Sequence, residues 1–283
     1  MSDEQRQLSG DMQQVVRDRL GQPVRLTVAG SDPAWRHQIA AIALADLLGR
    51  FCTDLTIACD PAAPAHPALP PGPALLLERL HDAAANGGSA SRAQDGPTAV
   101  VSVAIAAGDG ADIYVDGSGW ISYVGTEPGS ALPDENTVVI GPLSAACRAA
   151  SRVHQRLLGD LQVARPQEPR SWWSALTLQA LDAAPDDVGP SLQQSFVDAL
   201  LMGAGSIGGA AVYTVARTPR LAGRLDVIDP ETLEARNALK ALVARQADVT
   251  AGASKPESTA GGGRWRNRAV VSLMAVRWVG LSA

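Results

Sequence analysis

Residues 196–237, FVDALLMGAGSIGGAAVYTVARTPRLAGRLDVIDPETLEARN, constrain the fold more than any other stretch of the chain. The apolar run at 197–202 has the length of a buried parallel strand, and a glycine-rich loop follows it directly. Residues 209–217 are compatible with a helix, and 224–228 with a second strand that leads into Asp229. A strand, a glycine loop, a helix, a strand and an acid in this order predict a Rossmann-like βαβ unit that binds a nucleotide.

Each conspicuous residue of this unit has a physical task. Gly203 permits a tight turn, Gly205 lets the backbone approach a phosphate, and Gly208 lets the helix pack on the strand. The N-terminus of the helix adds unpaired N–H groups and a positive dipole end, which attract a phosphate. Asp229 lies about 20 residues after the third glycine, where a carboxylate accepts hydrogen bonds from ribose hydroxyls.

The run VIDPETLEARNALK resembles the ThiF/MoeB/HesA family, the adenylating relatives of ubiquitin-activating enzymes. Asp229 matches the family's first acid, and Glu231 stands where the family usually has a second aspartate. Asn237 matches the family's asparagine, and Lys240 falls where the family has arginine. Further on, GASK, which ends at Lys255, resembles the family's G-x-x-K.

The resemblance implies ATP-dependent chemistry. A substrate carboxylate attacks the α-phosphate of ATP, which gives an acyl-adenylate and releases pyrophosphate. In such a site the three glycines, Asp229, Glu231 and Asn237 bind the nucleotide, Lys240 and Lys255 serve catalysis, and Mg²⁺ is expected. The implied substrate is the C-terminal carboxylate of a ubiquitin-like or sulfur-carrier protein. A homodimer, or an internal pseudo-dimer of two fused halves, is implied as well.

Two family features are missing from the sequence. Active members place a Mg²⁺-binding aspartate, and many place a catalytic cysteine, downstream of the lysine. Here no aspartate follows Asp248 and no cysteine follows Cys147, so no Mg²⁺ ligand is identified. We therefore expect an adenylation domain that is incomplete at its C-terminal end, with weak or absent turnover.

Two other classes of protein remain open. A glycine loop followed by an acid also fits an NAD(P)- or FAD-dependent Rossmann oxidoreductase. The four histidines, at positions 37, 66, 81 and 154, all lie in the first half, and none has a recognisable catalytic setting. The missing aspartate and cysteine also fit a non-catalytic pseudoenzyme that serves as a scaffold.

Composition excludes several kinds of partner. The net charge of −5 gives no electrostatic basis for binding nucleic acid. The chain has no apolar run of about 20 residues, so we expect no membrane span. The polar start and the three widely spaced cysteines predict a cytoplasmic protein with reduced thiols.

The first half predicts a second α/β unit without a glycine fingerprint. Strands at 24–30 and 54–59 flank a helix at 34–51 that is capped by Asp32, and a strand at 98–107 and a hairpin at 113–124 follow. The phrase DGSGWIS is loosely similar to the N-terminal halves of larger bacterial ThiF-family proteins, which implies a degenerate, pseudo-adenylation domain; an unrelated α/β domain is the alternative. We therefore expect an arm at 1–22, this α/β domain at 23–160, a linker at 161–187 and an incomplete ThiF-like domain at 188–283 whose tail adds a strand at 269–279.

Overall fold

The chain has a mixed α/β, Rossmann-like fold in a computed structural model. The structure describes residues 3–70, 72–93, 98–106, 110–133, 136–161, 169–193, 195–219, 221–234 and 244–262. Asn237, Lys240 and the strand predicted at 269–279 lie outside these residues.

The larger part of the fold is one eight-stranded sheet with the strand order β3-β2-β1-β4-β5-β6-β7-β8. Its first five strands run parallel to their neighbours, and β6, β7 and β8 continue the sheet antiparallel. The strands are β1 (Val24–Val28), β2 (Leu55–Ala58), β3 (Ser91–Ala93), β4 (Val101–Ile105), β5 (Ile113–Ser118), β6 (Ile121–Gly125), β7 (Arg170–Ser174) and β8 (Gln179–Leu181). The chain winds outwards in both directions from β1, so a switch point of the doubly wound type lies between β1 and β4.

Side-chain alternation along the strands divides the core between the two faces of this sheet. Val103 and Ile105 of β4 belong to the main cluster of buried residues, whereas Ala104 between them belongs to a second cluster. On β5, Tyr114 belongs to the second cluster, whereas Ile113 and Val115 on either side of it belong to the main cluster. Because the side-chain period of a strand is two, both faces are buried where such strands are apolar throughout.

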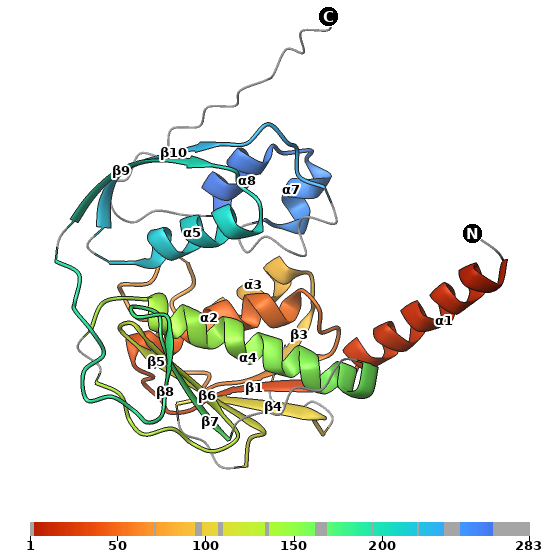
Figure 1. Cartoon of the computed structure of the whole chain (residues 1–283), viewed down its shortest axis with the longest axis horizontal. Helices are drawn as coiled ribbons and strands as arrows, with labels where there is room; N and C mark the ends of the chain where they lie inside the picture. The colour runs from red at the N-terminus through yellow and green to blue at the C-terminus, as the bar shows by residue number, and fades with distance from the viewer. Residues whose placement is uncertain are drawn as a thin grey trace, which may run out of the picture.

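Three helices cover one face of the sheet: α2 (Trp35–Gly49), α3 (Leu76–Gly87) and α4 (Ile140–Leu158) (Figure 1). Two glycines allow α2 and α3 to approach closely. A Cβ atom on Gly49 would lie 2.3 Å from the carbonyl oxygen of Ala84, and one on Gly87 would lie 2.6 Å from that of Asp46. The single turn η1 (Gly159–Leu161) follows α4.

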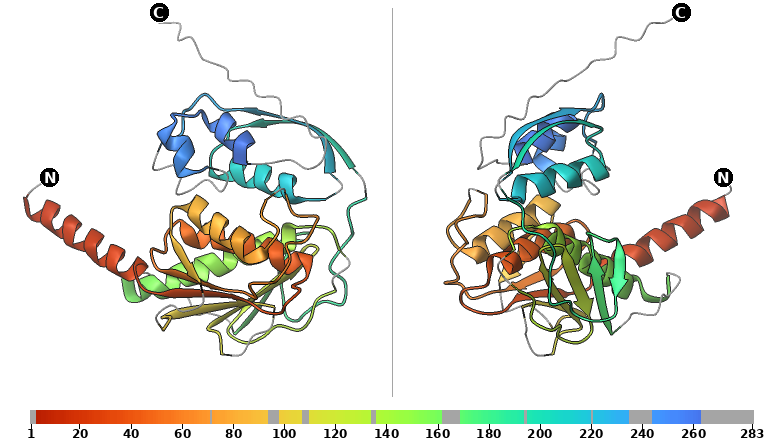
Figure 2. Two further views of the ribbon diagram at one scale, coloured as in Figure 1. Left: turned by 180° about the vertical axis from the view of Figure 1, so that it is seen from behind. Right: turned by 60° about the vertical axis from the view of Figure 1, so that its left-hand side comes forward.

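The N-terminal arm is the helix α1 (Asp3–Leu20), which projects from the body in all three views (Figures 1 and 2).

The predicted N-cap of α2 is wrong. The N-cap of α2 is Ala34, without a side-chain capping bond, so Asp32 does not cap the helix.

Part of the segment predicted as a linker, 161–187, belongs to the sheet. Trp172 and Trp173 lie on β7, which pairs antiparallel with both β6 and β8. Trp172 is buried, and its ring centroid lies 4.4 Å from that of Tyr123 on β6. The tryptophans therefore extend the first half instead of joining two halves.

A second, smaller unit lies above the helical layer (Figure 1). It consists of the parallel pair β9 (Ser195–Met202) and β10 (Leu221–Ile228), the connecting helix α5 (Ser206–Arg217), and the short helices α7 (Gln246–Thr250) and α8 (Lys255–Gly262). Helix α5 lies between the small sheet and the helices of the first half (Figure 2). The prediction that the first strand is fully buried is wrong for one face, since Leu200 and Met202 are 58% and 79% exposed.

None of the helices within the described ranges is both long and apolar enough to cross a bilayer.

Candidate functional site

The glycine loop joins β9 to α5, and two of its glycines are required by geometry. Gly203 has a φ of +95°, and its N–H donates to the Ile228 carbonyl at 2.7 Å, so the chain turns sharply at the strand end. A Cβ atom on Gly208 would fall 1.9 Å from the carbonyl oxygen of Gly203, which leaves no room for a side chain. Gly205 differs from both, because a Cβ atom there would meet nothing within 4 Å. The space beside the loop is open.

The N-terminus of α5 faces this open space without a side-chain cap. Gly205 is the N-cap residue, and the first helical bond runs from the Gly209 N–H to the Gly205 carbonyl at 2.8 Å. The N–H groups of the first turn have no partner inside a helix, and they form its positive dipole end. Such an end attracts an anion.

Asp229 fixes the loop from behind. Its carboxylate is buried, and Oδ2 accepts a hydrogen bond from the Ala204 N–H at 2.7 Å. Oδ1 accepts a hydrogen bond from the Glu231 N–H at 2.9 Å. Each carboxylate oxygen has two lone pairs, so Asp229 holds the backbone of the loop and keeps acceptor capacity for a ligand.

Glu231 connects this acid to Lys255, 24 positions further on. The Lys255 ammonium donates a short hydrogen bond to Glu231 Oε2, and the Lys255 N–H donates to the Glu231 carbonyl at 3.1 Å. The Lys255 side chain is 10% exposed and that of Glu231 is 67% exposed, so the ion pair lies at the surface end of a buried lysine. An antiparallel bridge between Thr232 and Ser254 fixes this approach.

The structure therefore brings Gly203, Gly205, Gly208, Asp229, Glu231 and Lys255 to one edge of the small sheet.

Asp248, the last aspartate in the sequence, stabilises two short helices. Its Oδ2 accepts bonds from the Arg245 N–H and the Ser258 hydroxyl, at 3.0 and 2.8 Å, and so caps α7 and ties it to α8. Over the described ranges, no group of three or more histidine, cysteine, aspartate or glutamate side chains is arranged to hold a metal.

The first half of the chain repeats part of the pattern of strand, glycine loop, helix, strand and acid. Its β1 ends in a loop with Gly30 at a φ of +91°, and its second strand is followed by Asp60-Pro61, as β10 is followed by Asp229-Pro230. Asp60 Oδ1 accepts a hydrogen bond from the Ala62 N–H at 2.8 Å. Asp229 Oδ1 accepts one from the Glu231 N–H in the same way, so both aspartates form the same local turn. The repeated Asp-Pro after the second strand is a sequence signal of this internal symmetry that our interpretation missed.

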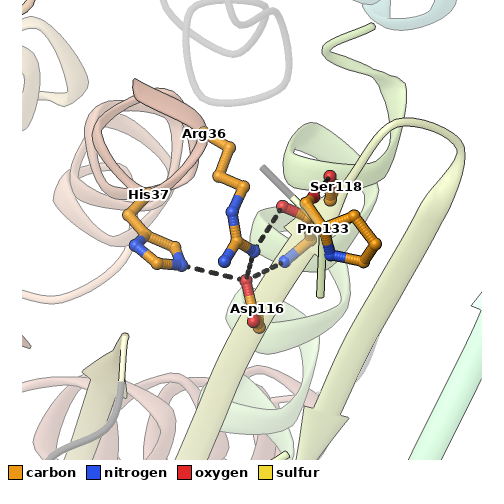
Figure 3. A network of polar contacts seen from close by, with 6 residues as sticks. Arg36, His37, Asp116, Ser118 and Pro133 are labelled. Carbon is orange, nitrogen blue, oxygen red and sulfur yellow. Dashed lines mark hydrogen bonds and ion pairs between the residues drawn. The ribbon is translucent and has the colours of Figure 1, made fainter. Parts of the chain in front are cut away.

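A polar cluster that the sequence did not indicate lies at the carboxyl end of β5 (Figure 3). Asp116 Oδ1 accepts hydrogen bonds from Arg36 Nη1 at 2.5 Å and from the Gly117 N–H at 2.7 Å. His37 Nε2 lies 3.1 Å from the same oxygen. Arg36 and His37 come from the first turn of α2, so the guanidinium and the imidazole are both engaged by a carboxylate of their own domain.

Comparisons with known proteins give partial similarities to a curated protein and to solved structures. No family model matches it. The uncharacterized protein y4jF of Sinorhizobium fredii (strain NBRC 101917 / NGR234) is 30% identical over 143 residues, which cover 48% of this chain and 26% of that protein. The chain thus matches about a quarter of the length of this curated relative.

Two crystal structures of E. coli MccB, one of them with AMPCPP and SeMet-labelled MccA, are similar to the chain with TM-scores of 0.41 and 0.36. Their identities are 12% and 11%, and the matches cover 59% of this chain and 65% and 63% of the MccB chains. The chain therefore spans less than two thirds of MccB. At this level of similarity neither structure assigns an activity to it.

Proposed function

We propose that the chain binds ATP at the glycine loop and is a ThiF-like adenylyltransferase or a derivative of one. The observation that supports this is a continuous polar path. It runs from the loop through Asp229 to Glu231 and ends at Lys255. An NAD-binding Rossmann unit needs the glycines and the acid, but it has no need for a lysine joined to them.

The residues fit the parts of the nucleotide. The open space at Gly205 and the uncapped N-terminus of α5 suit the phosphates. Asp229 and Glu231 suit the ribose, and Lys255 would exchange its bond to Glu231 for a phosphate contact. Asn237 and Lys240 are proposed on the family resemblance alone, as is Mg²⁺, whose ligand is not identified. Bound ATP would supply the electrophilic α-phosphate for a carboxylate, proposed to be the C-terminus of a ubiquitin-like or sulfur-carrier protein.

The first test fills the phosphate space without disturbing the fold. In Gly205→Val the new Cβ atom meets no neighbour within 4 Å, and the φ of −73° is one that residues with side chains adopt. We expect the melting temperature to fall somewhat, because valine is a poorer N-cap residue than glycine, while the Kd for ATP measured by calorimetry rises at least about tenfold, or 1.4 kcal/mol. Unchanged ATP binding by a folded variant would contradict the proposed phosphate site.

The second test distinguishes the contribution of the ribose contact to ATP binding from that of the phosphate contacts. Asp229→Asn keeps an oxygen for the Ala204 N–H, but it replaces the oxygen that accepts the Glu231 N–H with an amide NH2 and removes the charge that favours ribose hydroxyls. We expect affinity for ATP to fall about tenfold and affinity for inorganic tripolyphosphate, which has no ribose, to change little. Asp60→Asn, at the matching position of the first half, is the control and should change neither.

ATP–pyrophosphate exchange with Mg²⁺ then separates the enzymatic possibilities. Exchange that is lost in Gly205→Val supports an adenylyltransferase. ATP binding without exchange supports a derivative that has lost turnover. Binding of NAD in place of ATP would indicate the oxidoreductase alternative, and binding of neither would leave the scaffold.

A further inference from the structure

A cavity of about 360 Å³ lies between the two parts of the fold. Its walls come from α2, α3 and the proline-rich loop on one side and from α5 and Arg245 on the other. This volume is within the range of about 300–1,000 Å³ that is usual for small-molecule sites. Ile39, Ile42 and Leu69 give the cavity an apolar wall.

Tyr213 of α5 lines this cavity, and its side chain carries an unpaired hydroxyl buried at the cavity wall. The residue is 2% exposed, and its ring packs with the main buried cluster of the first half. Its hydroxyl is buried and has no hydrogen-bond partner among the described residues. Burial raises the pKa of Tyr213 to about 12, so the group stays protonated and able to donate. A buried hydroxyl without a partner is unfavourable, which a ligand in the cavity would correct.

Two arginines, Arg217 and Arg245, line the same cavity, and Arg217 Nη1 also donates to the Tyr213 carbonyl at 3.4 Å. The Arg217 guanidinium carbon lies 3.3 Å from the centroid of the Tyr213 ring, so the stacked side chain is held in place. Arg245 also lines the cavity. Within the described ranges neither arginine has a carboxylate at ion-pair distance.

The other charged groups of the lining offset these two arginines only in part, since the Asp46 carboxylate interacts with Arg217 and Arg245 but is bonded to Arg50. Asp46 is bonded to Arg50, through Nε at 3.0 Å and Nη2 at 2.7 Å. Arg79 donates to the carbonyls of Pro73 and Pro70 and so shapes the proline-rich wall. Asp82 lies exposed on α3. The interior of the cavity therefore has an excess of positive charge.

We propose that this cavity binds a phosphorylated small molecule, with its phosphate between Arg217, Arg245 and the Tyr213 hydroxyl and its apolar part against α2. A phosphate dianion matches two guanidinium groups and a hydroxyl donor better than a single carboxylate does. The site is separate from the glycine loop, because that loop precedes α5 whereas Arg217 ends it, about 16 Å further along the helix. The ligand would contact both halves and hold them together.

The experiment uses phenyl phosphate, inorganic phosphate and benzoate as probes, with thermal shift and calorimetry on the full chain. We expect phenyl phosphate to raise the melting temperature most, because it combines the dianion with an apolar ring. Arg245→Met should weaken its binding at least about tenfold. The control Arg224→Met removes an equal charge from an exposed pair with Asp226 on β10 and should leave binding unchanged.

Tyr213→Phe distinguishes a ligand-binding hydroxyl from a structural one. We expect the free protein to be as stable as the wild type or more so, since the variant loses only an unpaired buried group, and phenyl phosphate to bind several-fold more weakly. The proposal is overturned if no probe binds at millimolar concentration. It is also overturned if Arg224→Met acts like Arg245→Met, or if Gly205→Val abolishes the binding, which would place the anion at the glycine loop.

Discussion

Gly208→Ala should destabilise the β9–α5–β10 unit by about 3 kcal/mol, the upper end of the usual cost of overpacking. The added Cβ atom would lie 1.9 Å from the carbonyl oxygen of Gly203 and 2.9 Å from its carbonyl carbon. Both contacts are to backbone, so no side chain can rotate away, and α5 must move off the loop. The helix-propensity gain of up to about 1 kcal/mol for Gly→Ala acts in the opposite direction. The measured loss is therefore the cost of the clash less this gain in propensity.

Hydrogen exchange over residues 195–228, together with denaturant unfolding, measures this effect locally and globally. Gly205→Ala, only three positions away, is the matched control because its Cβ atom meets nothing within 4 Å. We expect a smaller loss of about 0.5–1 kcal/mol, because alanine is a poorer N-cap residue than glycine but creates no clash here. Equal behaviour of the two variants would mean that the loop is not packed on α5 as described.

The sequence predicted those elements whose patterns are local. The strand near residue 24, the helix after it and the strand at 55 were placed within a few residues, because apolar periodicity and turn residues mark them. The strands β7 and β8 were missed. They are short, and the pairing of Trp172 with Tyr123 joins strands that are separated in the chain by helix α4, which no local pattern describes. The same limit applies to β3, which is three residues long and was not predicted.

The sequence also predicted those parts of the candidate site that belong to a local motif, and it missed those that depend on contacts between distant positions. The glycine spacing and Asp229 define a local motif, and the family resemblance carried Glu231 and Lys255, which the structure does bring together. The bonds between Arg36 and Asp116 join positions 80 apart, on α2 and β5, so only the sheet order shows them. The cavity beside Tyr213 was also beyond the sequence, since it exists only where the two parts of the fold meet.

Asp46→Ala should be the most destabilising change of those considered, with a loss of about 3–5 kcal/mol in the free energy of unfolding. The side chains of Asp46 and Arg50 are 7% and 5% exposed, and the two bonds between them are 3.0 and 2.7 Å long. Burial raises the pKa of Asp46, while the Arg50 guanidinium acts to lower it. Removal of the carboxylate leaves the guanidinium buried without its counter-charge, which costs more than the pair contributes.

The double variant Asp46→Leu/Arg50→Met tests that reasoning by removing both charges at similar volume. Buried ion pairs replaced by apolar residues are often nearly neutral, so we expect the double variant to recover most of the stability that Asp46→Ala loses. Arg50 Nη2 also donates to the Ala244 carbonyl at 3.4 Å, beside Arg245, so this pair connects the first half to the second. If denaturant unfolding shows the double variant to be as unstable as Asp46→Ala, the cost lies in that connection and not in the unpaired charge.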